Sequence, residues 1–139
     1  MSKRIKNAVL MLFSLIIGLI LYVFYRPETY ISKLFFFILP NIRVQNLAHP
    51  VGNLVLGCYA PDFLWGFSLS CGLCVVFSGN WKCTEICCFT AFLCGLIWEI
   101  GQFFGLFSGT ADTLDILVYL LAACLCQLLN IKGSNYEKN

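Results

Sequence analysis

Four acidic residues, Asp62, Glu99, Asp112 and Asp115, lie within or directly beside long apolar runs of this sequence. A charged side chain at the centre of a membrane helix costs roughly 3 kcal/mol, and such residues usually face a protein interior or a watery cavity. Carboxyl groups in these surroundings suit acid–base chemistry, proton transfer or the binding of a polar ligand. They are therefore the first candidates for a functional site.

Spacing predicts that several polar side chains meet in one cluster. Gln102 lies one turn from Glu99 on the same helix face. The short hairpin 108–111 predicts that the helices on either side are antiparallel neighbours. Asp115 then reaches the level of Gln102, and Tyr119 the depth of Glu99, about 12 Å from a helix end at Phe107. The predicted cluster comprises Glu99, Gln102, Asp112, Asp115 and Tyr119.

Each acid also has a structural interpretation. Asp112 and Asp115 are spaced as an N-cap and its capping-box partner, and negative charge suits a helix N-terminus. Asp62 follows Pro61 directly and is placed to cap the helix that begins there. Glu99 lies in mid-helix, where the alternative to a functional group is a structural hydrogen-bond hub.

The elements that must hold these residues are membrane helices. The chain has 139 residues, of which 60% are hydrophobic and 12% charged, with a mean hydropathy of +0.83. Soluble domains carry about 25% charged residues. We predict an all-α polytopic membrane protein, a single domain over 1–139 with about four transmembrane helices, at 8–25, 62–77, 86–107 and 112–131. A net charge of +2 without a basic block argues against nucleic acid as a partner.

The segment between the first and second helices contains two apolar pieces, Tyr30–Leu39 and Val51–Tyr59, each too short to span a bilayer. We interpret them as interfacial or re-entrant segments. The alternative is a fifth, broken helix that includes Leu54–Tyr59.

Basic residues set the predicted orientation. With four spans, one side holds Lys3, Arg4, Lys6, Lys82, Lys132 and Lys138, and the other holds Arg26, Lys33 and Arg43. This split predicts that both termini are cytoplasmic and that the acidic residues lie in the outer half of the membrane.

Most of the nine cysteines lie in apolar runs, where cysteine packs as a small hydrophobe. Cys71 and Cys74 form a CxxC, but the only histidine, His49, is far along the chain. We therefore expect neither a metal ion nor another cofactor. Gly101 with Gly105, and Ser68 with Gly72, have the spacing that permits close helix approach.

Two sequence blocks resemble the VanZ-like family of small bacterial membrane proteins. The first combines Trp98-Glu99-Ile100-Gly101-Gln102 with Gly109-Thr110-Ala111-Asp112-Thr113-Leu114-Asp115, and the second is Pro61-Asp62-Phe63-Leu64-Trp65. The resemblance covers about residues 60–125. It implies the bacterial plasma membrane and a connection to the cell envelope, and it adds Asp62 and Trp65 to the candidate site residues.

The acidic residues and the resemblance together suggest three functional hypotheses. In the first, the outward-facing cluster binds an envelope lipid, a peptide or a protein partner, and so changes susceptibility to the glycopeptide teicoplanin. In the second, the acids act as the acid–base pair of a membrane hydrolase or transferase with an amphiphilic substrate. In the third, Glu99 carries a proton for a transport subunit. Whether the protein is an enzyme is left open.

Overall fold

The computed structural model describes residues 2–25, 30–38, 55–77, 81–107 and 111–135. These residues form helices and their connections, with no strand in the described ranges. The elements are α1 (Lys3–Tyr25), α2 (Tyr30–Ile38), the π-helical turn η1 (Val55–Tyr59), α4 (Ala60–Val76), α5 (Trp81–Phe103) and α6 (Thr113–Asn135). The all-α prediction is confirmed.

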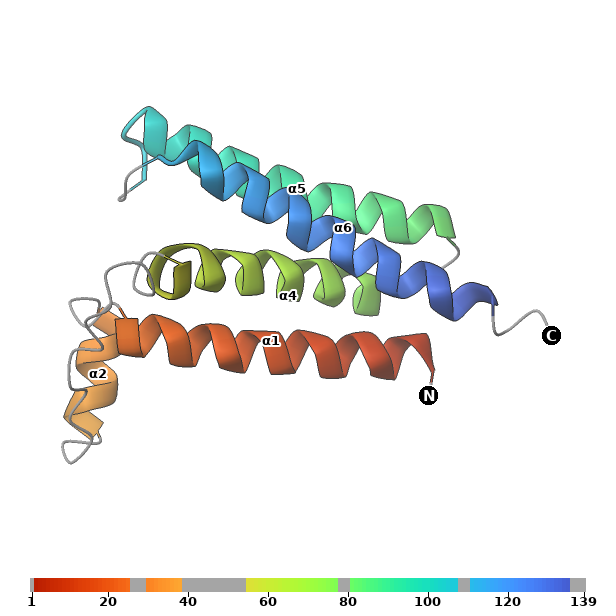
Figure 1. The fold of residues 1–139 in the computed structure, drawn as a ribbon, viewed down its shortest axis with the longest axis horizontal. Helices are drawn as coiled ribbons and strands as arrows, with labels where there is room; N and C mark the ends of the chain where they lie inside the picture. Colours follow the sequence, from red (N-terminus) through yellow and green to blue (C-terminus); the bar gives the residue numbers. More distant parts are fainter. Residues whose placement is uncertain (1, 26–29, 39–54, 78–80, 108–110, 136–139) are drawn as a thin grey trace.

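The four long helices run alternately up and down, so that the start of α1 and the end of α6 lie at the same end of the molecule (Figure 1). Helix α4 is central because it packs against α1, α5 and α6. The short α2 turns away across the far end of α1 (Figure 1). One end of the bundle therefore holds the termini, and the other holds the connection that leads from α5 to α6.

Four helical segments are long and apolar enough to cross a membrane: Lys3–Tyr25, Val55–Val76, Lys82–Phe103 and Thr113–Ile131. Their outer faces are apolar as well. Phe13 on α1 is 64% exposed and Ile86 on α5 is 66% exposed. Large exposed apolar side chains on every long helix are what a multi-pass membrane protein presents to lipid.

The described part of the segment between the first two long helices does not form a separate fifth helix. Val55–Tyr59 forms a π-helical turn that leads straight into α4 and lengthens that helix at its start. Tyr30–Ile38 is helical and short, in agreement with a segment that does not span. The rest of this segment, residues 39–54 including His49, lies outside the described residues.

Helix α5 ends at Phe103, four residues before the predicted end at Phe107. Gly105 has a φ of +68°, a left-handed conformation that stops the helix, and the Leu106 N–H then donates to the Gly101 carbonyl at 2.8 Å. The chain folds back so that the Phe107 ring stacks on Trp98, with centroids 4.6 Å apart. Glu99 is consequently only about 6 Å from the end of its helix.

Small residues on α4 permit close packing against α1. The Ser68 hydroxyl donates to the Met11 carbonyl at 3.1 Å. A Cβ on Gly72 would lie 3.1 Å from the Met11 sulfur. The small-xxx-small pattern of α4 therefore serves packing within the bundle. The equivalent pattern of α5 does not, because Gly105 lies beyond the helix and nothing is within 4 Å of where its Cβ would be.

Candidate functional site

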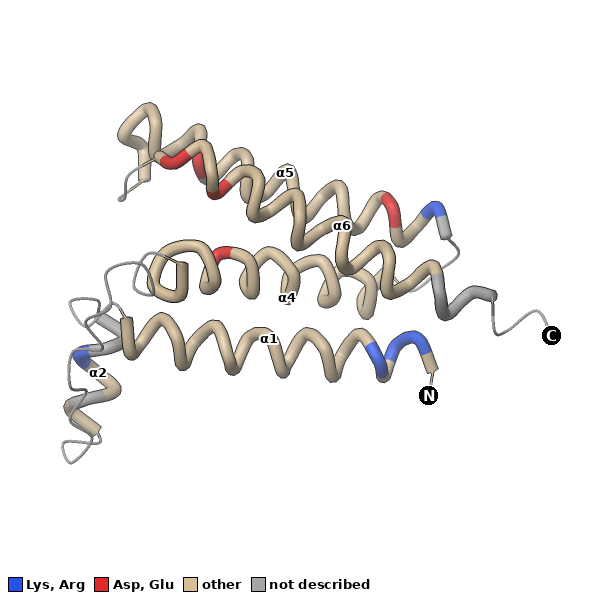
Figure 2. Tube along the Cα trace, in the orientation of Figure 1, with Lys and Arg blue, Asp and Glu red and all other residues tan. Residues whose placement is uncertain are grey.

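The acidic residues at the beginnings of α4 and α6 and near the end of α5 gather at the end of the bundle opposite the termini (Figure 2). We call Asp62, Glu99, Asp112 and Asp115, together with Tyr59 and Tyr119, the acidic cluster. Three helices and the η1 turn supply its members, which lie apart in the sequence but meet where these elements converge.

Asp112 and Glu99 together hold the first turn of α6. The Asp112 carboxylate accepts a hydrogen bond from the Leu114 N–H at 2.9 Å, which is the geometry of an N-cap. The Asp112 N–H itself donates to Glu99 Oε2 at 3.1 Å. The capping interpretation of Asp112 is thus correct, and the Glu99 side chain, only 4% exposed, ties the start of α6 to α5.

Tyr59 is a member of the cluster that sequence reasoning missed. Its hydroxyl donates to Asp112 Oδ2 at 3.2 Å, which leaves the two oxygens of this carboxylate with different partners. The sequence placed Tyr59 in an interfacial piece ahead of the second helix. Only the continuous η1–α4 helix brings it over the start of α6.

Tyr119 is buried at the centre of the cluster, with 4% of its surface exposed. Its hydroxyl lies within electrostatic range of Asp62, Glu99 and Asp115. Its ring fits between two glycines: a Cβ on Gly95 would lie 2.6 Å from the ring, and one on Gly66 would lie 3.1 Å from it. The glycines of α4 and α5 therefore let this residue of α6 enter the space between them.

The capping interpretation of Asp62 is wrong. Helix α4 continues from the η1 turn, its N-cap position is Tyr59, and no side chain caps it. Asp62 lies inside the first turn, within electrostatic range of Tyr119. Its position is therefore explained by the cluster.

The remaining predicted site residues surround this group. The Trp65 ring, 48% exposed, meets the edge of Tyr119 with centroids 6.5 Å apart. Asp115 lies in the first turn of α6 and is partly buried. Gln102, also partly buried, follows Glu99 by one turn of α5, close to the helix end. The predicted hairpin residues 108–110 lie outside the described ranges.

A second group of side chains that could hold a ligand lies toward the end with the termini. The sulfurs of Cys74, Cys88 and Cys126 all lie within 4.8 Å of one another, and all three residues are buried. The Cys71 and Cys126 sulfurs are 3.7 Å apart. We call these four residues the cysteine cluster. The expectation that cysteines pack in the core holds for them, but no local pattern of residues indicates that three helices bring them together.

Comparisons with protein-family models, with curated proteins and with solved structures give no match to this chain.

Proposed function

We propose that this protein is a VanZ-like multi-pass protein of the bacterial plasma membrane whose acidic cluster binds a ligand of the cell envelope. The observation that carries the proposal is the convergence of four carboxyl groups from three helices at one end of an otherwise apolar bundle. Charged groups in such surroundings are costly and usually mark a functional site. Capping accounts for Asp112, and the Asp112 N–H is a partner of Glu99, but Asp62 has no capping role.

The charge of the three helices that form the cluster favours a ligand with a positively charged group. Helix α4 contains no lysine or arginine, and the only basic residues of α5 and α6 are Lys82 and Lys132, both at the opposite end. The helices that supply the carboxyl groups therefore supply no cation to balance them. An amino group of a lipid headgroup, a peptide or a glycopeptide has the complementary charge.

The distribution of basic residues supports an outward-facing cluster. Six lysines and arginines belong to the side that holds the termini and three to the other, and the more basic side is normally cytoplasmic. The acidic cluster then opens toward the outer leaflet, where envelope lipids and glycopeptides are found. This placement agrees with the envelope role that the resemblance implies.

The proposal is tested by measuring susceptibility to teicoplanin and other envelope-directed antibiotics. The strains compared are a bacterial host without the gene and the same host with the wild type or a variant at matched membrane levels. The test variants are Asp62→Asn and Glu99→Gln, since each amide keeps a hydrogen-bonding oxygen while the charge is lost. We expect the wild type to change susceptibility and both variants to return it to the level of the strain without the gene.

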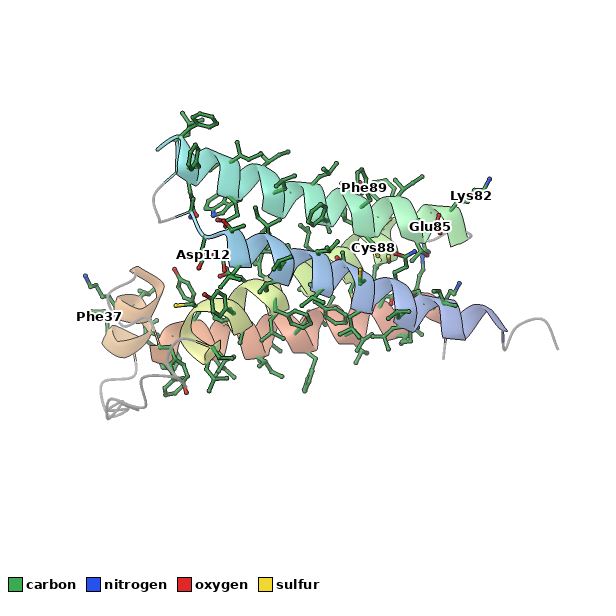
Figure 3. All side chains as sticks on the ribbon, turned by 45° about the horizontal axis from the view of Figure 1, so that its top comes forward. Phe37, Lys82, Glu85, Cys88, Phe89 and Asp112 are labelled. Atoms are coloured by element: carbon green, nitrogen blue, oxygen red, sulfur yellow. The ribbon has the colours of Figure 1, made fainter. Side chains whose placement is uncertain are left out.

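The matched control is Glu85→Gln. Glu85 is an exposed acid on the same helix as Glu99, but it lies at the opposite end from Asp112 (Figure 3). This variant should behave as the wild type. Equal susceptibility in all strains, or equal loss in the control, would reject a function at the acidic cluster.

One observation favours the acid–base alternative. Glu99 is almost fully buried whereas Asp112 is partly exposed, and carboxyl groups in unlike surroundings can divide the roles of acid and base. Tyr59 would then orient the Asp112 carboxylate. Hydrolysis of an amphiphile by the purified wild type, abolished in Glu99→Gln, would favour this alternative over binding alone.

A further inference from the structure

The cysteine cluster draws one residue or more from each of three helices. Cys71 and Cys74 are three residues apart on α4 and therefore share a face, while α5 supplies Cys88 and α6 supplies Cys126. Exposed fractions of 0% for Cys71 and Cys126, 2% for Cys88 and 6% for Cys74 place all four inside the bundle. Figure 3 shows Cys88 on the inner side of α5, with its neighbour Phe89 pointing away from the bundle.

We propose that Cys74, Cys88 and Cys126 bind a thiophilic metal ion, Zn²⁺ or Cu⁺, with Cys71 as the fourth ligand in the case of zinc. Both ions favour thiolate sulfur and accept sites of three or four such ligands. The site is separate from the acidic cluster and does not depend on the function proposed for it.

The sulfur geometry is close to that of a bound site. A point equidistant from three sulfurs that are 4.8 Å apart is about 2.8 Å from each, so a contraction of about 0.5 Å reaches the Zn–S bond length of about 2.3 Å. The Cys71–Cys126 sulfur separation of 3.7 Å already matches the edge of a tetrahedral zinc–sulfur site, about 3.8 Å. Small side-chain rotations are therefore enough for the three-sulfur site, while Cys71 must also approach Cys74 and Cys88 to complete a zinc site.

Polar groups around the thiols support the bound form. The Asn130 amide nitrogen lies 3.7 Å from the Cys126 sulfur and donates to the Cys126 carbonyl at 2.8 Å. The Asn7 amide in turn donates to Asn130 Oδ1 at 3.1 Å. Both asparagines are buried, at 3% and 2% exposure, so an amide N–H is oriented toward a ligand sulfur from outside.

Charge balance favours the site as well. Metal binding converts each ligand thiol to a thiolate and releases its proton, so Zn²⁺ with four thiolates and Cu⁺ with three both give a site with two net negative charges. Lys6 acts electrostatically on Cys71, and its ammonium group donates to the Leu129 carbonyl on α6 at 2.7 Å. A cation is thus fixed beside the cluster, where it offsets the cost of burying that charge.

The test measures metal bound by the full-length protein, purified in detergent with a non-chelating reductant and reconstituted with Zn²⁺ alone or Cu⁺ alone. We expect one ion per chain and, after Co²⁺ substitution, thiolate-to-cobalt charge-transfer absorption. Cys88→Ser and Cys126→Ser should each lower the affinity by at least about tenfold. A competing chelator specific for Cu⁺ identifies which of the two ions binds more tightly.

Matched controls lie on the same two helices. Cys94 on α5 and Cys124 on α6 are exposed, so Cys94→Ser and Cys124→Ser should bind metal as the wild type does. The cobalt spectrum and the Cu⁺ stoichiometry of the wild type need no variant, so together they remain decisive if a cluster variant fails to fold. The absence of both this absorption and stoichiometric Cu⁺ binding in the wild type would overturn the proposal, as would wild-type metal content in folded cluster variants. A Cys71–Cys126 disulfide in protein isolated without reductant would overturn it too.

Discussion

The ring of Tyr119 occupies a slot that two glycines leave open. Gly95 and Gly66 have no side chain, and the tyrosine of α6 fills the space between α5 and α4. This fit brings the Tyr119 side chain to Asp62 and within range of Glu99. The position of the Tyr119 hydroxyl in the acidic cluster therefore depends on two glycines, Gly66 and Gly95, that take no direct part in the cluster.

The effect of Gly95→Ala on stability should change sign when Tyr119 is removed. Gly95→Ala places a methyl 2.6 Å from the ring, and overpacking of this kind costs about 1–3 kcal/mol, while replacing a mid-helix glycine by alanine gains about 0.5–1 kcal/mol. We expect the substitution to destabilise the wild type by about 1–2 kcal/mol. In a Tyr119→Ala background it should stabilise by about 0.5–1 kcal/mol.

Unfolding in a single detergent, followed by circular dichroism, gives all four corners of this double-mutant cycle. The same sign in both backgrounds would contradict the close contact between Gly95 and Tyr119.

At the scale of the element, the end of α5 determines where Glu99 lies relative to the start of α6. The left-handed Gly105 reverses the chain, and Phe107 returns to stack on Trp98 beside Gly101, which has no Cβ to obstruct the ring. This turn shortens α5 and places Glu99 where it can reach the backbone of Asp112. A straight helix to Phe107 would carry the chain past the start of α6.

Gly105→Ala tests this turn without a steric effect, because nothing lies within 4 Å of the position of its Cβ. The left-handed conformation costs an alanine about 1–2 kcal/mol, and asparagine tolerates it better. We expect Gly105→Ala to lower the free energy of unfolding by about 1 kcal/mol and Gly105→Asn by less. Both are measured by thermal or denaturant unfolding in detergent. Equal stability of alanine, asparagine and glycine at this position would argue against a left-handed cap.

At the scale of the whole molecule, alternating helices place the connections from α4 to α5 and from α5 to α6 at opposite ends (Figure 1). The excess of basic residues on the side of the termini predicts that the first connection is cytoplasmic and the second external. The proposed outward opening of the acidic cluster requires this orientation.

Reporter fusions test the orientation directly. A fluorescent protein fused after Asn139 or inserted at 78–80 should fluoresce in the cytoplasm, while alkaline phosphatase should be active only when inserted at 108–110. The reverse pattern would place the acidic cluster in the cytoplasm and exclude an envelope ligand.

Apolar length predicted the four long helices well, because hydrophobic runs locate spans whatever their neighbours are. The helix ends were predicted less well. Helix α1 begins at Lys3 among basic residues, and α5 ends early because Gly105 adopts a conformation that periodicity does not reveal. Helical spacing and the antiparallel hairpin anticipated the grouping of Glu99, Asp115 and Tyr119.

Contacts that involve several helices were not predicted from the sequence. The role of Asp62 depends on the η1 turn before it and on a tyrosine from another helix. The cysteine cluster depends on how α4, α5 and α6 are rotated about their axes, which a single sequence does not encode in any local pattern. Contacts between distant segments are thus where the structure adds most.

Helix α1 is attached to the rest of the bundle mainly along one partner, α4, through Met11 and the small residues opposite it. Helices α4, α5 and α6 contact one another without it. During synthesis the first helix is therefore made before the surface of α4 to which it binds. A break in the polypeptide between α2 and η1 would separate α1 and α2 from the other helices in sequence and leave every described helix–helix interface intact.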